Sequence, residues 1–203
     1  MTETIDIDFG ILGSMEFKTG EAQFGDQFRD VMNRSATEGL PDEFKYIIEE
    51  AEQIKTKRAQ LNFINIRINK LVVYTDDRVA FNSRDHWASP QEFIRQGGDC
   101  EDYAIAKFLT LMEIGFISHE LRIVIVRDTR RKILHAVCTA PLNEGAFDDV
   151  MILDNVFDIP VSHIRILKYT PLYSFNRFNE WSHISTNPIR AKFVAKERAI
   201  RGI

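Results

Sequence analysis

The chain has 203 residues, of which 44% are hydrophobic and 28% charged, and its formal net charge is -4. This length and composition fit one globular domain with a full core, and the charge gives no reason to expect nucleic acid as a partner. The two cysteines, Cys100 and Cys138, support neither a disulfide framework nor a CxxC zinc pattern.

Signals for export and membrane insertion are absent from the sequence pattern. The longest aliphatic run, at residues 123–126, is too short to span a bilayer, so we expect no transmembrane segment. Residues 1–15 carry Glu3, Asp6 and Asp8 where a secretory signal requires a basic start and a long apolar run. The pattern therefore predicts no export signal, and a cytoplasmic location if the chain is complete.

The first part of the chain divides near Pro41. Residues 1–40 contain five glycines and no sustained apolar period, which predicts a loosely structured arm or one packed on the domain. From Pro41 the apolar residues recur at helical spacing, which predicts an amphipathic helix to about Lys57. A second helical series covers 61–71 and leads into the β-rich segment 71–74.

The middle of the chain combines one central helix with short strands. Ser89 and Pro90 are suited to cap and open a short helix, and a glycine pair follows it. Cys100 then opens a helix of about four turns that stops near Gly115. Three β-branched segments predict an antiparallel meander packed on this helix, and a fourth strand is expected later. These segments are 121–126, 133–139, 150–153 and 164–173.

The resulting fold class is α+β, in one main domain. We expect a domain at 41–184 that includes an N-terminal helical part. The tail 185–203 is basic and fits either a solvated terminal helix or a basic amphipathic helix at a membrane or nucleic-acid surface.

Cys100 is the first candidate for chemistry. A cysteine at a helix N-terminus faces unpaired backbone N–H groups and the positive end of the helix dipole, which favour the thiolate. The alternative is a small buried hydrophobic residue. The polar neighbours Asp99, Glu101 and Asp102 argue against an apolar site, so the local pattern leaves a nucleophile and a metal site both open.

His135 and Asp154 are candidates to complete a cysteine-protease triad. Such a triad needs a thiolate, an imidazole that holds it as an ion pair, and a group that orients the imidazole. His135 lies in the second expected strand and Asp154 ends the third, so adjacent strands can bring them together. Each residue alone also fits a structural role, as a core histidine and a turn residue.

These segments carry a family resemblance. Residues 98–104 read GDCEDYA, and they are followed by residues 121–124, 135–137, 152–155 and 171–176, with the upstream segment 85–90 reading DHWASP. From about Asn65 to about Trp181 the chain resembles the bacterial transglutaminase-like cysteine proteinases, and within them the LapG-type proteases.

The resemblance implies a fold, a mechanism and a biological setting. The fold is a papain-like, transglutaminase-type core with the nucleophile at the N-terminus of a central helix on an antiparallel sheet. Cys100 would be the nucleophile, His135 the general base and acid, and Asp154 the orienting group. LapG-type enzymes are periplasmic and calcium-binding, cleave a large surface adhesin to release biofilm cells, and are restrained by the cyclic di-GMP receptor LapD.

Calcium also has a physical argument in this sequence. Asp99, Glu101 and Asp102 place three carboxylates around Cys100, and Ca²⁺ binds carboxylate and carbonyl oxygens. Without a cation their charge would raise the pKa of the thiol. The structural alternative is that the acids only complement the helix dipole.

Other interpretations stay open. The same triad can pass its thioester to an amine, as a transglutaminase or an amidase acting on glutamine, or the fold can serve as a non-catalytic binding module. Trp87 is a candidate cleft residue or oxyanion donor through its indole N–H, with packing as its alternative role. Ala136, Val137 and Cys138 stand where the family pattern carries larger apolar residues, and residues 1–58 have no match.

Overall fold

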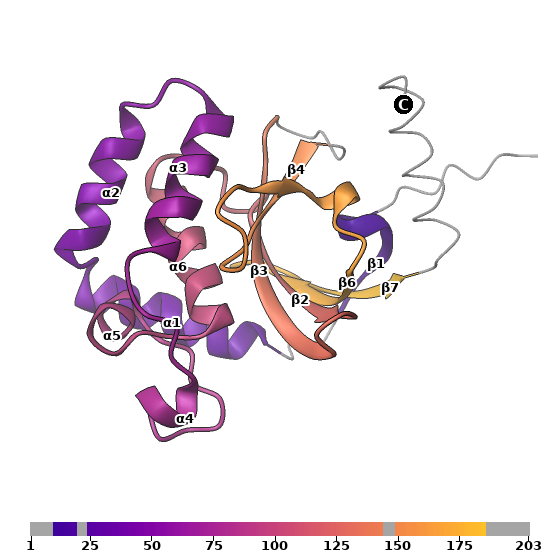
Figure 1. Cartoon of the computed structure of the whole chain (residues 1–203), viewed down its shortest axis with the longest axis horizontal. Coiled ribbons are helices and arrows are strands. Elements are labelled where there is room, and N and C mark those ends of the chain that lie inside the picture. The colour runs from indigo at the N-terminus through magenta and orange to yellow at the C-terminus, as the bar shows by residue number, and fades with distance from the viewer. Residues whose placement is uncertain (1–9, 20–23, 144–148, 186–203) are drawn as a thin grey trace, which may run out of the picture.

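A layer of helices covers one face of an antiparallel sheet (Figure 1). The computed structural model describes residues 10–19, 24–143 and 149–185. The helices are α1 (Gly25–Glu38), α2 (Asp42–Glu52), α3 (Lys57–Asn69), α4 (Asp77–Ala80), α5 (Pro90–Gln96) and α6 (Cys100–Glu113). The strands are β1 (Ser14–Lys18), β2 (Arg122–Asp128), β3 (Ile133–Pro141), β4 (Val150–Leu153), β5 (Val161–Ser162), β6 (Tyr169–Phe175) and β7 (Glu180–Ser185).

The sheet supports the predicted α+β class and extends beyond the predicted meander. Within the described residues its strand order is β1-β7-β6-β2-β3-β4-β5, and every neighbouring pair is antiparallel. The three meander strands β2, β3 and β4 agree with the prediction. The fourth strand was predicted at 164–173 and lies further along the chain, as β6 at Tyr169–Phe175. His163–Arg165 form a short 3-10 turn instead of the start of this strand.

The N-terminal arm is more regular than a loosely structured segment. Its residues 14–18 form the edge strand β1 on β7, and residues 25–38 form helix α1. Arg34 of α1 donates hydrogen bonds to the carbonyl of Trp87 and to Glu92 of α5, both at 2.5 Å. The arm therefore packs on the segment that leads to Cys100, which corresponds to the second of the two alternatives predicted for it.

A buried polar chain attaches β1 to the sheet. The Nδ1 of His183 lies 2.7 Å from Ser14 Oγ, and its Nε2 lies 2.8 Å from Ser174 Oγ. Burial lowers the pKa of His183 to about 4, so this imidazole is neutral at pH 7. The three hydrogen-bonding residues join β1, β7 and β6.

Two observed elements differ from the prediction in their boundaries or type. The helix expected to reach Lys57 ends at Glu52, and α3 starts after Thr56, whose side chain accepts a hydrogen bond from the Ala59 N–H. The β-rich segment 71–74 is not a strand, because its pairing is limited to one parallel bridge between Tyr74 and Gly98. This bridge and a hydrogen bond from the Tyr103 hydroxyl to the Val72 carbonyl, at 2.8 Å, hold the segment next to the start of α6.

The approach to α6 follows the sequence prediction closely. Ser89 and Glu92 form a capping box at α5, with Pro90 at the first helical position. Gly97 has a φ of +78, and a Cβ there would lie 2.5 Å from the Val73 carbonyl. A Cβ on Gly98 would lie 2.5 Å from Asp102 Oδ2. Both glycines are therefore required for the close approach of this loop.

The core lies on both faces of the sheet. The larger cluster fills the space between the helices and the sheet and includes Phe108 of α6 and Cys138 of β3. A smaller cluster on the other face includes Val137 and Tyr169. The alternation of Val137 and Cys138 between the two faces is the period-2 pattern of a strand buried on both sides.

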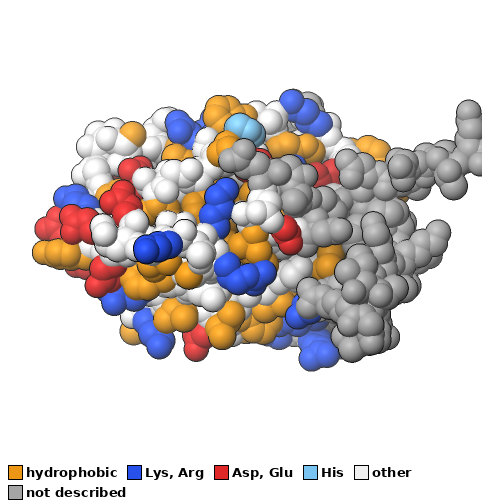
Figure 2. Space-filling view, turned by 90° about the horizontal axis from the view of Figure 1, so that it is seen from above, with side chains coloured by type: hydrophobic (Ala, Val, Ile, Leu, Met, Phe, Trp, Pro, Cys, Tyr) orange, Lys and Arg blue, Asp and Glu red, His pale blue; other side chains and the backbone are white. Residues whose placement is uncertain are grey.

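The surface mixes charge types. Figure 2 shows Lys, Arg, Asp and Glu side chains interspersed with hydrophobic ones on the face viewed from above. In the described part of the chain, no helix has the length and apolar character needed to cross a bilayer. The predicted basic tail, apart from Ser185 in β7, lies outside the described residues.

Candidate active site

The predicted nucleophile is the first residue of α6. The thiol of Cys100 is partly buried and donates to Glu101 Oε2 at 3.2 Å. Burial raises the pKa of this thiol well above its usual value, and the nearby carboxylates of Glu101 and Asp99 raise it further. A hydrogen bond from the Ala136 backbone acts in the opposite direction. Without a compensating positive charge, the thiol is therefore protonated at neutral pH.

His135 and Asp154 are joined as the sequence predicted. His135 Nε2 lies 2.8 Å from Asp154 Oδ1, and both side chains are buried. Asp154 also accepts hydrogen bonds from Tyr169 Oη at 2.5 Å and from the Val156 N–H at 2.9 Å. Burial alone would raise the pKa of Asp154, but these bonds and the imidazole hold it below its usual value. The carboxylate is therefore ionised next to the imidazole.

A single cavity contains the predicted nucleophile and base. Cys100 and His135 both line a cavity of about 520 Å³ between the helical layer and the sheet. Because Nε2 of His135 is engaged by Asp154, Nδ1 is the ring nitrogen left to serve the thiol. This arrangement can bring a thiol, an imidazole and a peptide carbonyl together.

Two asparagines of α3 hold the loop that carries Asp154. Asn69 Nδ2 donates to the carbonyls of Asp154 at 2.9 Å and Phe157 at 3.1 Å. One turn earlier, Asn65 Nδ2 donates to the carbonyls of Phe157 at 2.6 Å and Asp158 at 3.0 Å. A helix of the helical layer thus fixes the backbone of the loop that follows strand β4 of the sheet.

A carboxylate cluster surrounds the start of α6. Asp99 and Glu101 lie with Cys100 in one group whose potential ligand atoms are within 4.8 Å of one another. Two further groups of the same size add residues that the sequence analysis did not select, namely Asp77 with Asp85 and Glu101, and Asp77 with Asp99 and Asp102. The doublet 76–77 and the segment 85–90 were visible in the sequence, but only the fold brings them to α6.

Asp102 has a structural function within this cluster. Its Oδ1 accepts the Ala88 N–H at 2.7 Å, and its Oδ2 accepts the Asp99 N–H at 3.0 Å. Burial raises the pKa of Asp102 to about 8, and burial together with Glu101 raises that of Asp99 to about 9. Through its two hydrogen bonds, Asp102 connects the segment before α5 to the start of α6, next to the other carboxylates.

The carboxylate cluster fits a bound Ca²⁺. Oδ1 of Asp77 and Oδ1 of Asp99 are buried and accept no hydrogen bond from the residues that the structure describes. Buried carboxylate oxygens normally have a partner, and oxygen ligands are those that Ca²⁺ prefers. Asp77 takes part in two of the three groups, one with Asp85 and Glu101 and one with Asp99 and Asp102.

Trp87 lies in the core rather than in the cavity lined by Cys100 and His135. Its indole N–H donates to Asp85 Oδ1 at 3.1 Å, and its ring stacks on Phe24 and Phe175. It is not among the residues that line the cavity with Cys100. The geometry fits its packing role and leaves the indole N–H occupied.

The match to a family model identifies the class of the protein. The model of the bacterial transglutaminase-like cysteine proteinases matches residues 40–187, which is most of the chain. The chain belongs to this family and is a cysteine peptidase with a transglutaminase-like fold. No curated protein shows significant similarity to it.

Solved structures of LapG from Legionella pneumophila are similar to this chain. One is 27% identical, covers 76% of this chain and 87% of its own, and superimposes with a TM-score of 0.60. The calcium-bound form is 24% identical over 84% of this chain and 98% of its own, with a TM-score of 0.60. The EGTA-treated form is 24% identical over 82% of this chain and 97% of its own, with a TM-score of 0.61. These last two support the fold.

Proposed function

We propose that this cysteine peptidase is an endopeptidase with a Cys100–His135–Asp154 triad. The observation that carries the proposal is the 2.8 Å contact of His135 with Asp154 in a chain whose Cys100 opens the helix on the same cavity. In the mechanism, His135 Nδ1 takes the thiol proton and Cys100 attacks the substrate carbonyl. His135 then protonates the leaving amine, and water hydrolyses the acyl-thioester.

Asp154 is assigned the role of orienting His135. Accepting the Nε2–H places the lone pair on Nδ1, and the negative charge of Asp154 stabilises the imidazolium that forms during the reaction. The Tyr169 hydroxyl and the Val156 N–H hold the carboxylate in place. The Asn65 and Asn69 contacts fix the same loop from the other layer.

The products distinguish the proposed reaction from its alternatives. We expect incubation with a mixture of proteome-derived peptides to give pairs of fragments whose summed mass exceeds the parent by one water, as seen by mass spectrometry. A transglutaminase would instead give cross-links to an added amine with loss of ammonia, and a glutamine amidase would deamidate the peptides. An unchanged mixture, together with a Cys100 that does not react with thiol-directed reagents, would favour a binding module.

We further propose that Ca²⁺ supports this activity, as the calcium-bound state of the LapG relative suggests. Asp77, Asp99 and Glu101 would hold the ion. When bound, it supplies positive charge beside Cys100, which favours the thiolate over the thiol. Asp85 and Asp102 lie beside these ligands, so the segments before α5 and α6 would be fixed together.

Removal of calcium is expected to impair the enzyme without changing Cys100. We expect EGTA to lower peptide cleavage by at least about tenfold, and Ca²⁺ but not Mg²⁺ to restore it and to raise the melting temperature. Asp99→Asn and Glu101→Gln should weaken Ca²⁺ binding in calorimetry. Glu113→Gln, at the exposed far end of α6, is the matched control. Equal activity and melting temperature in EGTA and Ca²⁺ would contradict the proposal.

The proposed substrate, cellular compartment and regulator are those of the LapG-type proteases that the chain resembles. We propose a protein substrate such as a large surface adhesin, cleavage in the periplasm, and control by a LapD-like cyclic di-GMP receptor. A large repeat adhesin and such a receptor encoded next to this chain would support the assignment. Pull-down of neither protein by the Cys100→Ala variant would count against it.

A further inference from the structure

Two tyrosine side chains line the cavity of Cys100 and His135, and they differ in their hydrogen bonds. The Tyr103 hydroxyl donates to the Val72 carbonyl at 2.8 Å, so it is already occupied. The Tyr74 hydroxyl makes no hydrogen bond within the described part of the chain, and 56% of this side chain is exposed. Tyr74 therefore offers an unused hydrogen-bond donor to a substrate in the cavity.

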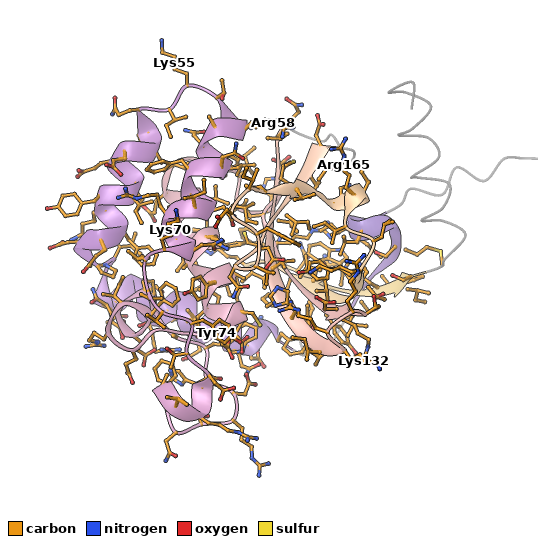
Figure 3. All side chains as sticks on the ribbon, in the orientation of Figure 1. Lys55, Arg58, Lys70, Tyr74, Lys132 and Arg165 are labelled. Carbon is orange, nitrogen blue, oxygen red and sulfur yellow. The ribbon has the colours of Figure 1, made fainter. Side chains whose placement is uncertain are left out.

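The ring of Tyr74 is held against the first turn of α6. It stacks on the Tyr103 ring, with centroids 6.5 Å apart and an angle of 14° between the ring planes. Tyr103 follows Cys100 by three positions, and side chains at this spacing are neighbours on one face of a helix. The Tyr74 backbone forms the bridge to Gly98, and the next N–H, of Thr75, donates to the Gly98 carbonyl at 2.9 Å. Tyr74 thus lies beside Cys100, on the helical side of the molecule (Figure 3).

The Tyr74 hydroxyl keeps its proton at neutral pH. Burial raises the pKa of this hydroxyl above its usual value, and the negative charge of a Cys100 thiolate raises it further. The second effect also means that the hydroxyl and the thiol are close enough to interact. A neutral phenol beside a nucleophile can donate a hydrogen bond to negative charge that develops there during a reaction.

The proposed acyl transfer develops negative charge at one particular atom. When the Cys100 thiolate adds to a peptide carbonyl, an electron pair moves to the carbonyl oxygen, which becomes an oxyanion. The Cys100 N–H is one available donor, because the first N–H groups of an α-helix have no intrahelical partner. Fuller stabilisation requires a second donor directed at the same oxygen.

Other side-chain donors near the thiol are occupied or lie on the opposite side of the cavity. The Trp87 indole N–H and the Asn69 amide already donate to other residues. Arg131 and Asn155 line the cavity from loops of the sheet, on the side of His135. The imidazole serves the leaving nitrogen, which is a different substituent of the attacked carbon from the oxygen. Tyr74 shares the helical side with the Cys100 N–H, so both groups can donate to one oxygen.

We infer that Tyr74 is a further catalytic residue, whose hydroxyl, together with the Cys100 N–H, binds the oxyanion formed when Cys100 attacks the substrate carbonyl. The inference rests on the proposed function, since it requires acyl transfer to Cys100. Tyr74 keeps its proton throughout. When the intermediate collapses, the carbonyl re-forms, the carbon–nitrogen bond breaks, and His135 gives its proton to the leaving amine. Recognition of a backbone carbonyl places no demand on the size of the side chains beside the scissile bond.

Two small reagents separate oxyanion binding from activation of the thiol. Acylation of Cys100 by p-nitrophenyl acetate passes through an oxyanion and releases p-nitrophenolate, whereas alkylation by iodoacetamide forms no oxyanion. Both rates are measured in Ca²⁺ for wild type and Tyr74→Phe, with Cys100→Ala as the blank. We expect Tyr74→Phe to be acylated about 100-fold more slowly than wild type, which is the usual effect of removing one oxyanion donor. Its alkylation rate and melting temperature should be unchanged, because the variant keeps the ring that stacks on Tyr103.

Tyr46→Phe is the matched control for loss of a tyrosine hydroxyl. Tyr46 is 64% exposed on α2 and is not among the residues that line the cavity, so this variant should keep both wild-type rates. Unchanged acylation of Tyr74→Phe would overturn the inference. Equal losses in acylation and alkylation would overturn it as well, because the hydroxyl would then act on the thiolate. A wild-type Cys100 that p-nitrophenyl acetate does not acylate would contradict the proposed function, and this inference with it.

Discussion

Cys100→Ala is expected to abolish peptide cleavage, with a loss in kcat of at least about 10,000-fold, because the thioester cannot form. The change removes one sulfur atom and its hydrogen bond to Glu101, and it leaves the His135–Asp154 pair intact. We therefore expect the melting temperature to be unchanged or raised. Cleavage of the peptide mixture by purified wild type and variant, followed by mass spectrometry, gives the comparison.

The second cysteine provides the matched control. Cys138 is fully buried, and burial raises the pKa of its thiol to about 12, so it cannot act as a nucleophile at neutral pH. Cys138→Ala should keep the specific activity of the wild type when compared at equal folded concentration. Full cleavage by Cys100→Ala, or its loss in Cys138→Ala with the fold preserved, would show that Cys100 is not the nucleophile.

Lys107→Met is expected to stabilise the protein. Lys107 lies two turns beyond Cys100 on α6, is fully buried, and its Nζ has no hydrogen-bond partner among the described residues. Its Nζ lies over the Tyr103 ring, 5.9 Å from the ring centroid. Burial lowers the pKa of Lys107 to about 7, and the charge of Asp154 only partly opposes this shift.

The sign of the pH effect follows from this pKa. The unfolded chain keeps the lysine charged up to about pH 10.4, whereas the folded protein releases the proton near pH 7. Between these values the unfolded state binds more protons, so the contribution of Lys107 to stability rises with pH. At pH 7 the buried lysine lowers the free energy of unfolding by about 4 kcal/mol. Between pH 7 and pH 9 about 2 kcal/mol of this loss is recovered, because the folded protein releases the proton.

Urea unfolding measures the difference in the free energy of unfolding between wild type and Lys107→Met. The measurement is made in Ca²⁺ at several pH values between 6 and 9. The variant should be more stable by about 4 kcal/mol at pH 7, and the gap should narrow toward pH 9. Lys107→Arg is the opposite test, since a guanidinium cannot release its proton and should destabilise the fold. A constant gap across this range would mean that the lysine is paired and charged in the folded protein.

The proposed catalytic residues could be selected from the sequence because the signals for them are local. Cys100 follows two glycines and opens an apolar-periodic helix, while His135 and Asp154 lie in short β-branched segments that follow it. Adjacent antiparallel strands then bring the last two together with little freedom. The contact between His135 and Asp154 agrees with the predicted order of helix and strands.

The elements that the sequence did not reveal depend on distant partners. Strand β1 is defined by pairing with β7, more than 160 residues later in the chain. Asp77 and Asp85 join the carboxylate cluster only because α4 and the following segment fold back onto α6. The segment 71–74 has β propensity, but it meets one residue of a loop and not a strand, so tertiary context decides against a sheet there.

The asparagine contacts of α3 give the site a mechanical property. The proposed nucleophile lies on a helix and the proposed base on the sheet, and Asn65 and Asn69 link α3 directly to the Asp154 loop. A motion that separates α3 from this loop would break four hydrogen bonds to the backbone that carries Asp154. If Cys100, His135 and Asp154 form the proposed triad, its alignment depends on the contact between α3 and this loop. Local opening at α3 should then inactivate the enzyme while the sheet is still intact.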